Sequence, residues 1–175
     1  MSEYLVLTAM GPDRTGSVSE LTKLASECGC NIVDSRMAIF GLEFTLIMLL
    51  NGSNKAIYQL ESKLPIVAHE LELITMMKRT SGYHERDFVH HYQANYAGID
   101  QPGILKAVTA FFATRNIDIS SLKSEIDQET NHMSAAVLIA LRENTSITQL
   151  EADFVELCEQ FDVQGCLKSV QSNLF

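Results

Sequence analysis

An internal repeat constrains the fold of this chain more than any other feature of its sequence. Residues 11–32, GPDRTGSVSELTKLASECGCNI, are matched by residues 98–119, GIDQPGILKAVTAFFATRNIDI. Both stretches open with Gly-x-Asp-x-x-Gly, continue with apolar residues at helical spacing, and end in Asn-Ile or Asp-Ile. The two stretches begin 87 positions apart (98 minus 11). A period this long indicates two copies of one domain, because the periods of solenoid repeats are shorter.

Each half of the chain predicts the same six elements in the same order. In the first half, strands are expected at 4–10, 31–40, 43–50 and 71–78, with helices at 17–28 and from Ser53 or Asn54 to about Leu64, where Pro65 should end the helix. In the second half, strands are expected at 88–97, 117–126, 132–141 and 166–171, with helices at 102–115 and 145–161.

The order strand, helix, strand, strand, helix, strand is that of the ferredoxin-like βαββαβ fold. In this fold a four-stranded antiparallel sheet carries both helices on one face. We therefore predict an α+β protein with two such domains, residues 1–79 and 88–175. Residues 80–87, TSGYHERD, show no apolar period and are predicted to link them.

Two of the predicted strands are apolar at both odd and even positions, FTLIMLL at 44–50 and AAVLIAL at 135–141. Both faces of each sheet should therefore avoid water, although the helices cover only one. We expect the second face or the strand edges to be covered by the other half of the chain or by a second subunit, so a homo-oligomer is possible. Cover by the linker and loops alone is the alternative.

Charge and hydropathy limit the partners of the chain. The 175 residues carry a formal net charge of −9, and the 13 basic residues are scattered, which argues against direct binding of nucleic acid. No apolar run approaches the roughly 20 residues that span a bilayer, and the acidic N-terminus is unlike a signal peptide. The sequence thus predicts a cytoplasmic protein without membrane contact.

Reactive side chains are too sparse to predict an enzyme. His90 and His91 are neighbours in an expected strand and should point to opposite faces, and no catalytic motif is present. Four cysteines are expected to be free thiols, namely Cys28, Cys30, Cys158 and Cys166. Their spacing does not match a zinc site. We expect no catalysis, no metal and no cofactor.

The first glycine-rich loop has the chemical groups needed to hold a small amino acid. A helix N-terminus offers unpaired N–H groups to a carboxylate, and Gly11 and Gly16 leave room beside the main chain. Asp13 can accept hydrogen bonds from an ammonium group, and Asn31 offers a donor and an acceptor. The sequence leaves a second interpretation open, in which Asp13 or Thr15 only caps the helix and Pro102 occupies the first helical position of the second copy.

The segments GPDRTG, CGCNIVDSRMAIFGLEFTLIMLLNGS and ELELITMMKRT make this chain resemble the glycine cleavage system transcriptional repressors of gamma-proteobacteria. The resemblance covers essentially the whole chain and is most specific in the first half. Members of that family consist of two ACT domains, small βαββαβ modules that often sense amino acids. The resemblance implies a regulator that binds a LysR-type activator protein, rather than DNA, and that releases its block when glycine is present.

The resemblance also implies where an effector such as glycine would bind. In ACT domains ligands commonly sit between two modules near the loop that follows the first strand. The positions implied here are Gly11, Asp13, Arg14, Thr15, Gly16, Asn31 and Ile32 in the first copy, and Asp100, Gln101, Gly103, Asp118 and Ile119 in the second. Because Asp118 replaces Asn31 and would repel a ligand carboxylate, we favour the first site. The alternative is an ACT-domain interaction scaffold that binds no small ligand.

Overall fold

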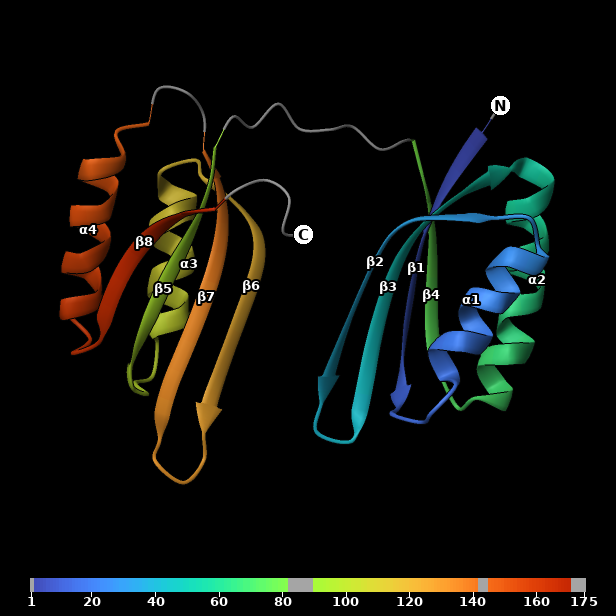
Figure 1. The fold of residues 1–175 in the computed structure, drawn as a ribbon, viewed down its shortest axis with the longest axis horizontal. Helices are drawn as coiled ribbons and strands as arrows, with labels where there is room; N and C mark the ends of the chain where they lie inside the picture. The colour runs from blue at the N-terminus through green and yellow to red at the C-terminus, as the bar shows by residue number, and fades with distance from the viewer. Residues whose placement is uncertain (1, 82–89, 142–144, 171–175) are drawn as a thin grey trace. The chain divides into compact units, whose positions relative to one another are not determined.

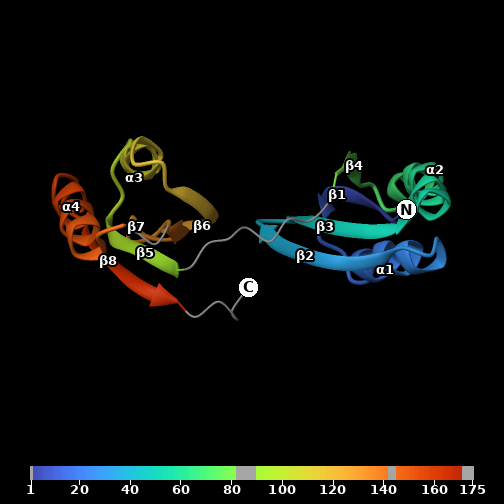
Figure 2. The same cartoon turned by 90° about the horizontal axis from the view of Figure 1, so that it is seen from above.

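The computed structural model describes residues 2–81, 90–141 and 145–170 and divides the chain into two compact units, residues 1–85 and 86–175 (Figure 1). We call them the first and the second module. In each, two helices pack on one face of a four-stranded antiparallel sheet (Figures 1 and 2). The prediction of two ferredoxin-like domains is therefore confirmed. Most of the predicted linker, residues 82–87, lies outside the described residues.

The two modules have the same element order and the same strand order. The first contains β1 Ser2–Pro12, α1 Ser17–Glu27, β2 Asn31–Phe40, β3 Glu43–Ser53, α2 Asn54–Glu70 and β4 Ile74–Thr80, in sheet order β2-β3-β1-β4. The second contains β5 His90–Ile99, α3 Ile104–Thr114, β6 Asp118–Asp127, β7 His132–Leu141, α4 Ile147–Glu159 and β8 Gln164–Val170, in sheet order β6-β7-β5-β8. The strands β2 and β6 also carry a bulge at corresponding places. It lies between Ile32 and Asp34 in β2 and between Ile119 and Ser121 in β6.

The core of each module lies between its sheet and its helices, because alternate strand residues point to the helix side. In the first module these are Leu5, Leu7 and Ala9 of β1 with Phe44, Leu46, Met48 and Leu50 of β3. In the second module the aromatic rings of Phe112 in α3 and Phe154 in α4 stack, with their centroids 5.7 Å apart. Burial of this apolar face is what fixes the register of the strands.

The second helix of the first module is longer than the sequence predicts. Pro65 was expected to end it, but α2 continues to Glu70 with Pro65 inside it. Leu64 and Ala68, one turn apart, are both buried against the sheet, and this packing outweighs the backbone hydrogen bond that the proline cannot donate. Consequently Leu71 ends the helix and β4 begins only at Ile74. The N-terminal prediction is confirmed, since Ser53 Oγ accepts from the Ala56 N–H at 3.2 Å.

The start of the third helix also differs from the prediction. Gly103, not Pro102, is the N-cap of α3, and Ile104 is its first residue. Pro102 therefore lies in the preceding loop and not at the first helical position.

None of the helices in the described residues combines the length and the apolar composition that a membrane-spanning helix needs.

Candidate functional site

The loop between β1 and α1 ends in an open helix N-terminus. Gly16 is the N-cap, with φ of 99°, and its carbonyl accepts from the Glu20 N–H at 2.9 Å. Among the described residues, the N–H groups of Val18 and Ser19 have no hydrogen-bond acceptor. A Cβ atom at Gly16 would meet nothing within 4 Å, so the space beside the helix end is free. The arrangement suits a small carboxylate.

Two contacts hold this loop in place. The Asp13 N–H donates to the Leu42 carbonyl at 2.9 Å, which ties the loop to the turn between β2 and β3. Arg14 pairs with Glu72, which ties it to the turn between α2 and β4. Because both charged side chains are largely exposed, this ion pair orients the loop more than it stabilises the module. Asp13 and Thr15 are exposed beside Gly16.

The capping interpretation of the loop is wrong, because no side chain caps α1. Gly16 occupies the N-cap position, so neither Asp13 nor Thr15 does. The positive φ at this position favours glycine, because a side chain there would strain the backbone. The structure thus assigns the exposed Asp13 carboxylate no role at the helix start.

Gly11 lies inside β1 rather than in the loop, and its surroundings are filled. A Cβ atom there would lie 2.7 Å from Leu73 Cδ2 and 2.8 Å from the Glu72 carbonyl oxygen. Gly98 of β5 is in the same position against Val163, at 2.8 Å from its Cγ1. Both glycines therefore allow close packing of the turn after the second helix, and the structure shows no free space for a ligand at either Cα.

The structure does not bring Asn31 and Ile32 close to the loop of their own module. Asn31 of β2 pairs with Asn51 of β3, and Asn51 pairs with Tyr4 near the start of β1. The glycine-rich loop follows Pro12 at the other end of β1. The eight positions from Tyr4 to Pro12 span about 26 Å at 3.3 Å per residue. The predicted first-module residues therefore form two groups at opposite ends of the sheet.

The second module repeats this separation with different side chains. Gly103 has φ of 95° with free space beside it, and the Asp100 N–H donates to the Asn131 carbonyl at 2.9 Å. Gln101 replaces Arg14 and is half-buried. Asp118 and Ile119 begin β6, at the far end of the sheet from this loop. The two loops share a backbone but not a charge pattern.

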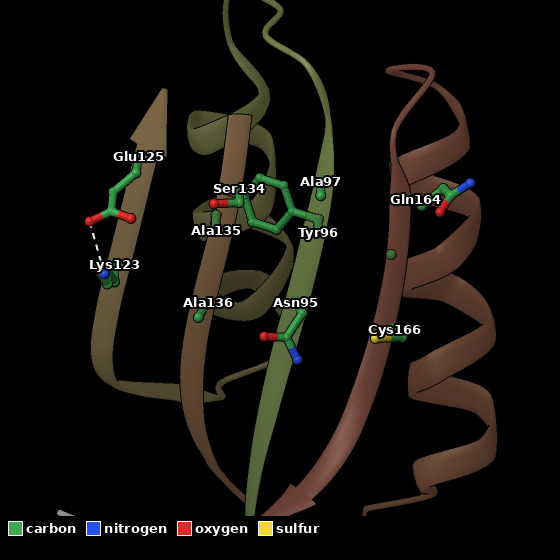
Figure 3. Close-up of a pocket in the computed structure, with 11 residues that line it drawn as sticks. Asn95, Tyr96, Ala97, Lys123, Glu125, Ser134, Ala135, Ala136, Gln164 and Cys166 are labelled. Atoms are coloured by element: carbon green, nitrogen blue, oxygen red, sulfur yellow. Dashed lines mark ion pairs between the residues drawn. The ribbon is translucent and has the colours of Figure 1, made fainter. Parts of the chain in front are cut away.

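A hollow on the second module was missed at the level of sequence. It lies on the sheet face away from the helices, has a volume of about 510 Å³, and is lined by polar side chains from all four strands (Figure 3). The main ones are Asn95, Lys123, Glu125, Ser134, Gln164 and Cys166. A signal did exist, since Ala97 and Gln164 stand where the first copy has Met10 and Ile74.

Two of the buried cysteines, Cys30 and Cys158, are poor nucleophiles. Burial raises the pKa of Cys158 to about 11, with a further rise from the nearby Cys166. Burial also raises the pKa of Cys30, with Cys28 adding to the rise. Thiols with raised pKa stay protonated at neutral pH and react slowly. In the part of the chain that the structure describes, no three His, Cys, Asp or Glu side chains group closely enough to hold a metal ion.

Comparison with known proteins identifies relatives over the whole chain. Residues 3–78 match the family model described as ACT domain. The glycine cleavage system transcriptional repressor of Escherichia coli (strain K12) is 36% identical over 171 residues, which cover 95% of this chain and 90% of that protein. The repressor of Shigella flexneri matches to the same extent. These relatives are named as regulators and not as enzymes.

Two solved structures superpose on nearly the whole chain. The crystal structure of a protein assigned as a glycine cleavage system transcriptional repressor superposes with a TM-score of 0.79, at 37% identity, over 98% of this chain and 99% of that one. An unknown protein from Galdieria sulphuraria superposes with a TM-score of 0.76 at 23% identity, over 98% of this chain and all of that one. The second likeness, at this low identity, concerns the fold alone.

Proposed function

Because this chain belongs to the family of glycine cleavage system transcriptional repressors, we propose that it regulates transcription in response to glycine by binding a LysR-type activator rather than DNA. The observation that carries the proposal is the 36% identity to a named repressor over 95% of the chain. A match over both modules supports shared regulation better than a match to one ACT domain would.

Charge supports a protein partner. The net charge is −9, and several cations are already paired with acids of the same module. Arg79 binds Glu3 and Glu61, and Arg115 binds Asp153. A surface of this kind repels the phosphates of DNA, whereas it suits a partner protein with basic side chains.

The glycine-rich loop supports a small zwitterion as the effector. The free N–H groups at the start of α1 would donate hydrogen bonds to its carboxylate, and the Asp13 carboxylate would accept hydrogen bonds from its ammonium group. Asn31 would have to come from elsewhere, because it lies about 26 Å from the loop of its own module. β2 is an edge strand, and antiparallel pairing with β2 of a second copy would bring Asn31 of one copy to the same end of the joined sheet as Asp13 of the other. We therefore propose that glycine binds between the first modules of two copies and changes their association.

Thermal unfolding with added glycine tests the effector. At a hundred times its Kd, glycine should stabilise the chain by roughly 2.7 kcal/mol. Asp13→Ala and Asn31→Ala should abolish the shift while leaving the unliganded melting temperature within about 2 °C of wild type, since both side chains are exposed. Asp100→Ala, in the second loop, is the matched control and should keep the shift. Loss of the shift in all three variants would contradict the first-loop site.

Co-purification with a purified LysR-type activator tests the partner. The complex should form without glycine and dissociate when glycine is added at saturating concentration. A complex that ignores glycine, together with no thermal shift for any amino acid, would leave the interaction scaffold as the better account.

One observation favours that scaffold as a second candidate. The face of the first sheet away from the helices exposes Met10, Ile47, Ile74 and Met76 by 46, 48, 70 and 68%. They are neighbours, since Met10 pairs with Ile74 and Thr8 pairs with both Met76 and Ile47. We call these four the apolar patch. Such a patch marks a surface that contacts another macromolecule.

A further inference from the structure

We propose that the hollow on the second sheet binds a polar α-amino acid larger than glycine, at a site separate from both glycine-rich loops. Every residue that lines it belongs to the second module, and none was predicted to bind an effector. The site adds a second specificity to the proposed regulator, but its occupancy does not depend on whether the first loop binds glycine.

Two adjacent rows of the sheet make the hollow. One row is Glu125, Ser134, Ala97 and Gln164, and the next is Lys123, Ala136, Asn95 and Cys166. Ala97 and Ala136 are the small floor of the two central strands, so the longer side chains on the outer strands stand around them (Figure 3). The volume of about 510 Å³ lies in the usual range for small-molecule sites. Glycine would leave most of it empty.

The β6 side of the hollow carries a matched pair of charges. Lys123 Nζ and Glu125 Oε1 are 2.8 Å apart, and the two side chains are 71 and 64% exposed. An exposed pair of this kind contributes little to folding. An α-amino acid bears its ammonium and carboxylate groups on one carbon, so it can lie antiparallel to this pair, with its carboxylate at Lys123 and its ammonium at Glu125.

The opposite side offers neutral polar groups. Gln164 and Cys166 project from β8, with Asn95 and Ser134 between them and the charged pair (Figure 3). The Asn95 amide is oriented by Gln93, whose Nε2 donates to Asn95 Oδ1 at 2.7 Å. Amides and hydroxyls across the alanine floor from the charged pair suit a ligand side chain that crosses this floor and ends in a carboxamide. Glutamine and asparagine have such side chains.

Protection of Cys166 from thiol labelling tests the site in the full chain. Cys28, Cys30 and Cys158 are buried, so a water-soluble maleimide should label Cys166 first, as mass spectrometry of its peptide can establish. We expect 10 mM L-glutamine to slow labelling by about threefold or more, which corresponds to a Kd of about 5 mM or below. Glycine and N-acetyl-L-glutamine, which lack the side chain or the ammonium group, should give less than half that protection.

Two variants decide the outcome. Ala136→Ile introduces the residue that the first module has at this position, Ile47, and should fill the floor and remove the protection. Lys123→Met should also remove it, whereas Lys168→Met, on the same face but outside the hollow, should keep it. Unchanged labelling with L-glutamine and L-asparagine, or equal protection in Lys123→Met and Lys168→Met, would overturn the proposal. Lys123→Met decides alone if Ala136→Ile does not fold, because Lys123 is exposed.

Discussion

The two modules share a backbone but differ on the sheet face that the helices leave uncovered. At corresponding places the first module has Met10, Ile47, Ile74 and Met76, and the second has Ala97, Ala136, Gln164 and Cys166. The first set forms an exposed apolar patch, and the second surrounds a hollow. Strand order, bulges and glycine-capped helices are the same in both.

This contrast separates what the fold requires from what function requires. The helix-facing sides of both sheets must stay apolar, because they form the core. At the positions of the apolar patch and the hollow the outer sides carry no such requirement, so after duplication these positions could change independently. The first face has the composition of a surface that contacts macromolecules, and the second has the composition of a small-ligand site.

The largest expected effect concerns a place where the cores also differ. Gly165 of β8 occupies the position of Thr75 of β4. A Cβ atom at Gly165 would lie 2.4 Å from Cys158 Sγ and 3.0 Å from its Cβ, so α4 would have to shift. We expect Gly165→Ala to lower the free energy of unfolding by about 2–3 kcal/mol, measured by hydrogen exchange in peptides of α4 and β8.

The matched variants show whether Cys158 is the cause. Cys158→Ala removes the sulfur atom, so the double variant with Gly165→Ala should be more stable than the sum of the single changes predicts. Thr75→Gly in the first module should lower the free energy of unfolding by about 1 kcal/mol or less, because the smaller residue introduces no steric clash. Equal costs at the two positions would mean that the cores do not differ in this way.

The next largest loss of stability, from replacing the N-cap glycine of α1 or α3, should be the same in both modules. Gly16 and Gly103 have φ of 99° and 95° with free space around them. Alanine would therefore cost only the strain of the left-handed conformation, about 1–2 kcal/mol at either position. Thermal unfolding checks this, with asparagine variants as controls that should cost less because asparagine tolerates positive φ. If Gly16→Ala alone removed the response to glycine, the two loops would differ in function and not in fold.

Most of the fold could be predicted from the sequence, because the repeat and the apolar spacing both follow from core packing. The end of α2 could not. Pro65 is a strong local signal, yet burial of Ala68 one turn beyond Leu64 depends on the sheet that lies beneath it. Local signals fail where a distant surface supplies the stabilising energy.

The candidate site was harder to predict, because register is not a local property. Asn31 follows the glycine-rich loop by 15 positions in the sequence but lies at the far end of the sheet. The hollow depends on four strands that meet only in the fold. Its sequence signal, small and polar residues where the first copy has large apolar ones, becomes clear only when the register shows which positions correspond.

Acid should affect the two modules through different partners. In the first, the hydrogen bond from Arg79 lowers the pKa of Glu61. In the second, Gln149 first and Arg115 next lower the pKa of Asp153. A carboxyl whose pKa is lower in the folded state adds stability that is present above its unfolded pKa, about 4, and is lost as pH falls through the folded value.

Melting temperature measured from pH 6 to pH 2 tests this difference. Arg79→Met should flatten the acid loss that Glu61 causes, because it removes the main partner. Arg115→Met should flatten the loss from Asp153 only in part, since Gln149 Nε2 still donates to Asp153 Oδ1 at 2.6 Å. Gln149→Leu should flatten it more. The opposite ranking of the two second-module variants would refute this account.

The smallest effect on stability should come from changing the apolar patch itself. Ile74→Gln with Met76→Gln gives the first sheet polar side chains like those of the second. Because Ile74 and Met76 are 70 and 68% exposed, the free energy of unfolding should change by about 0.5 kcal/mol or less per substitution. Binding to the activator, or self-association in sedimentation velocity, should weaken if the patch is a contact surface. A loss of about 2 kcal/mol or more in stability would show that these side chains are already covered in solution, and the contrast between the two faces would then lie in what covers them.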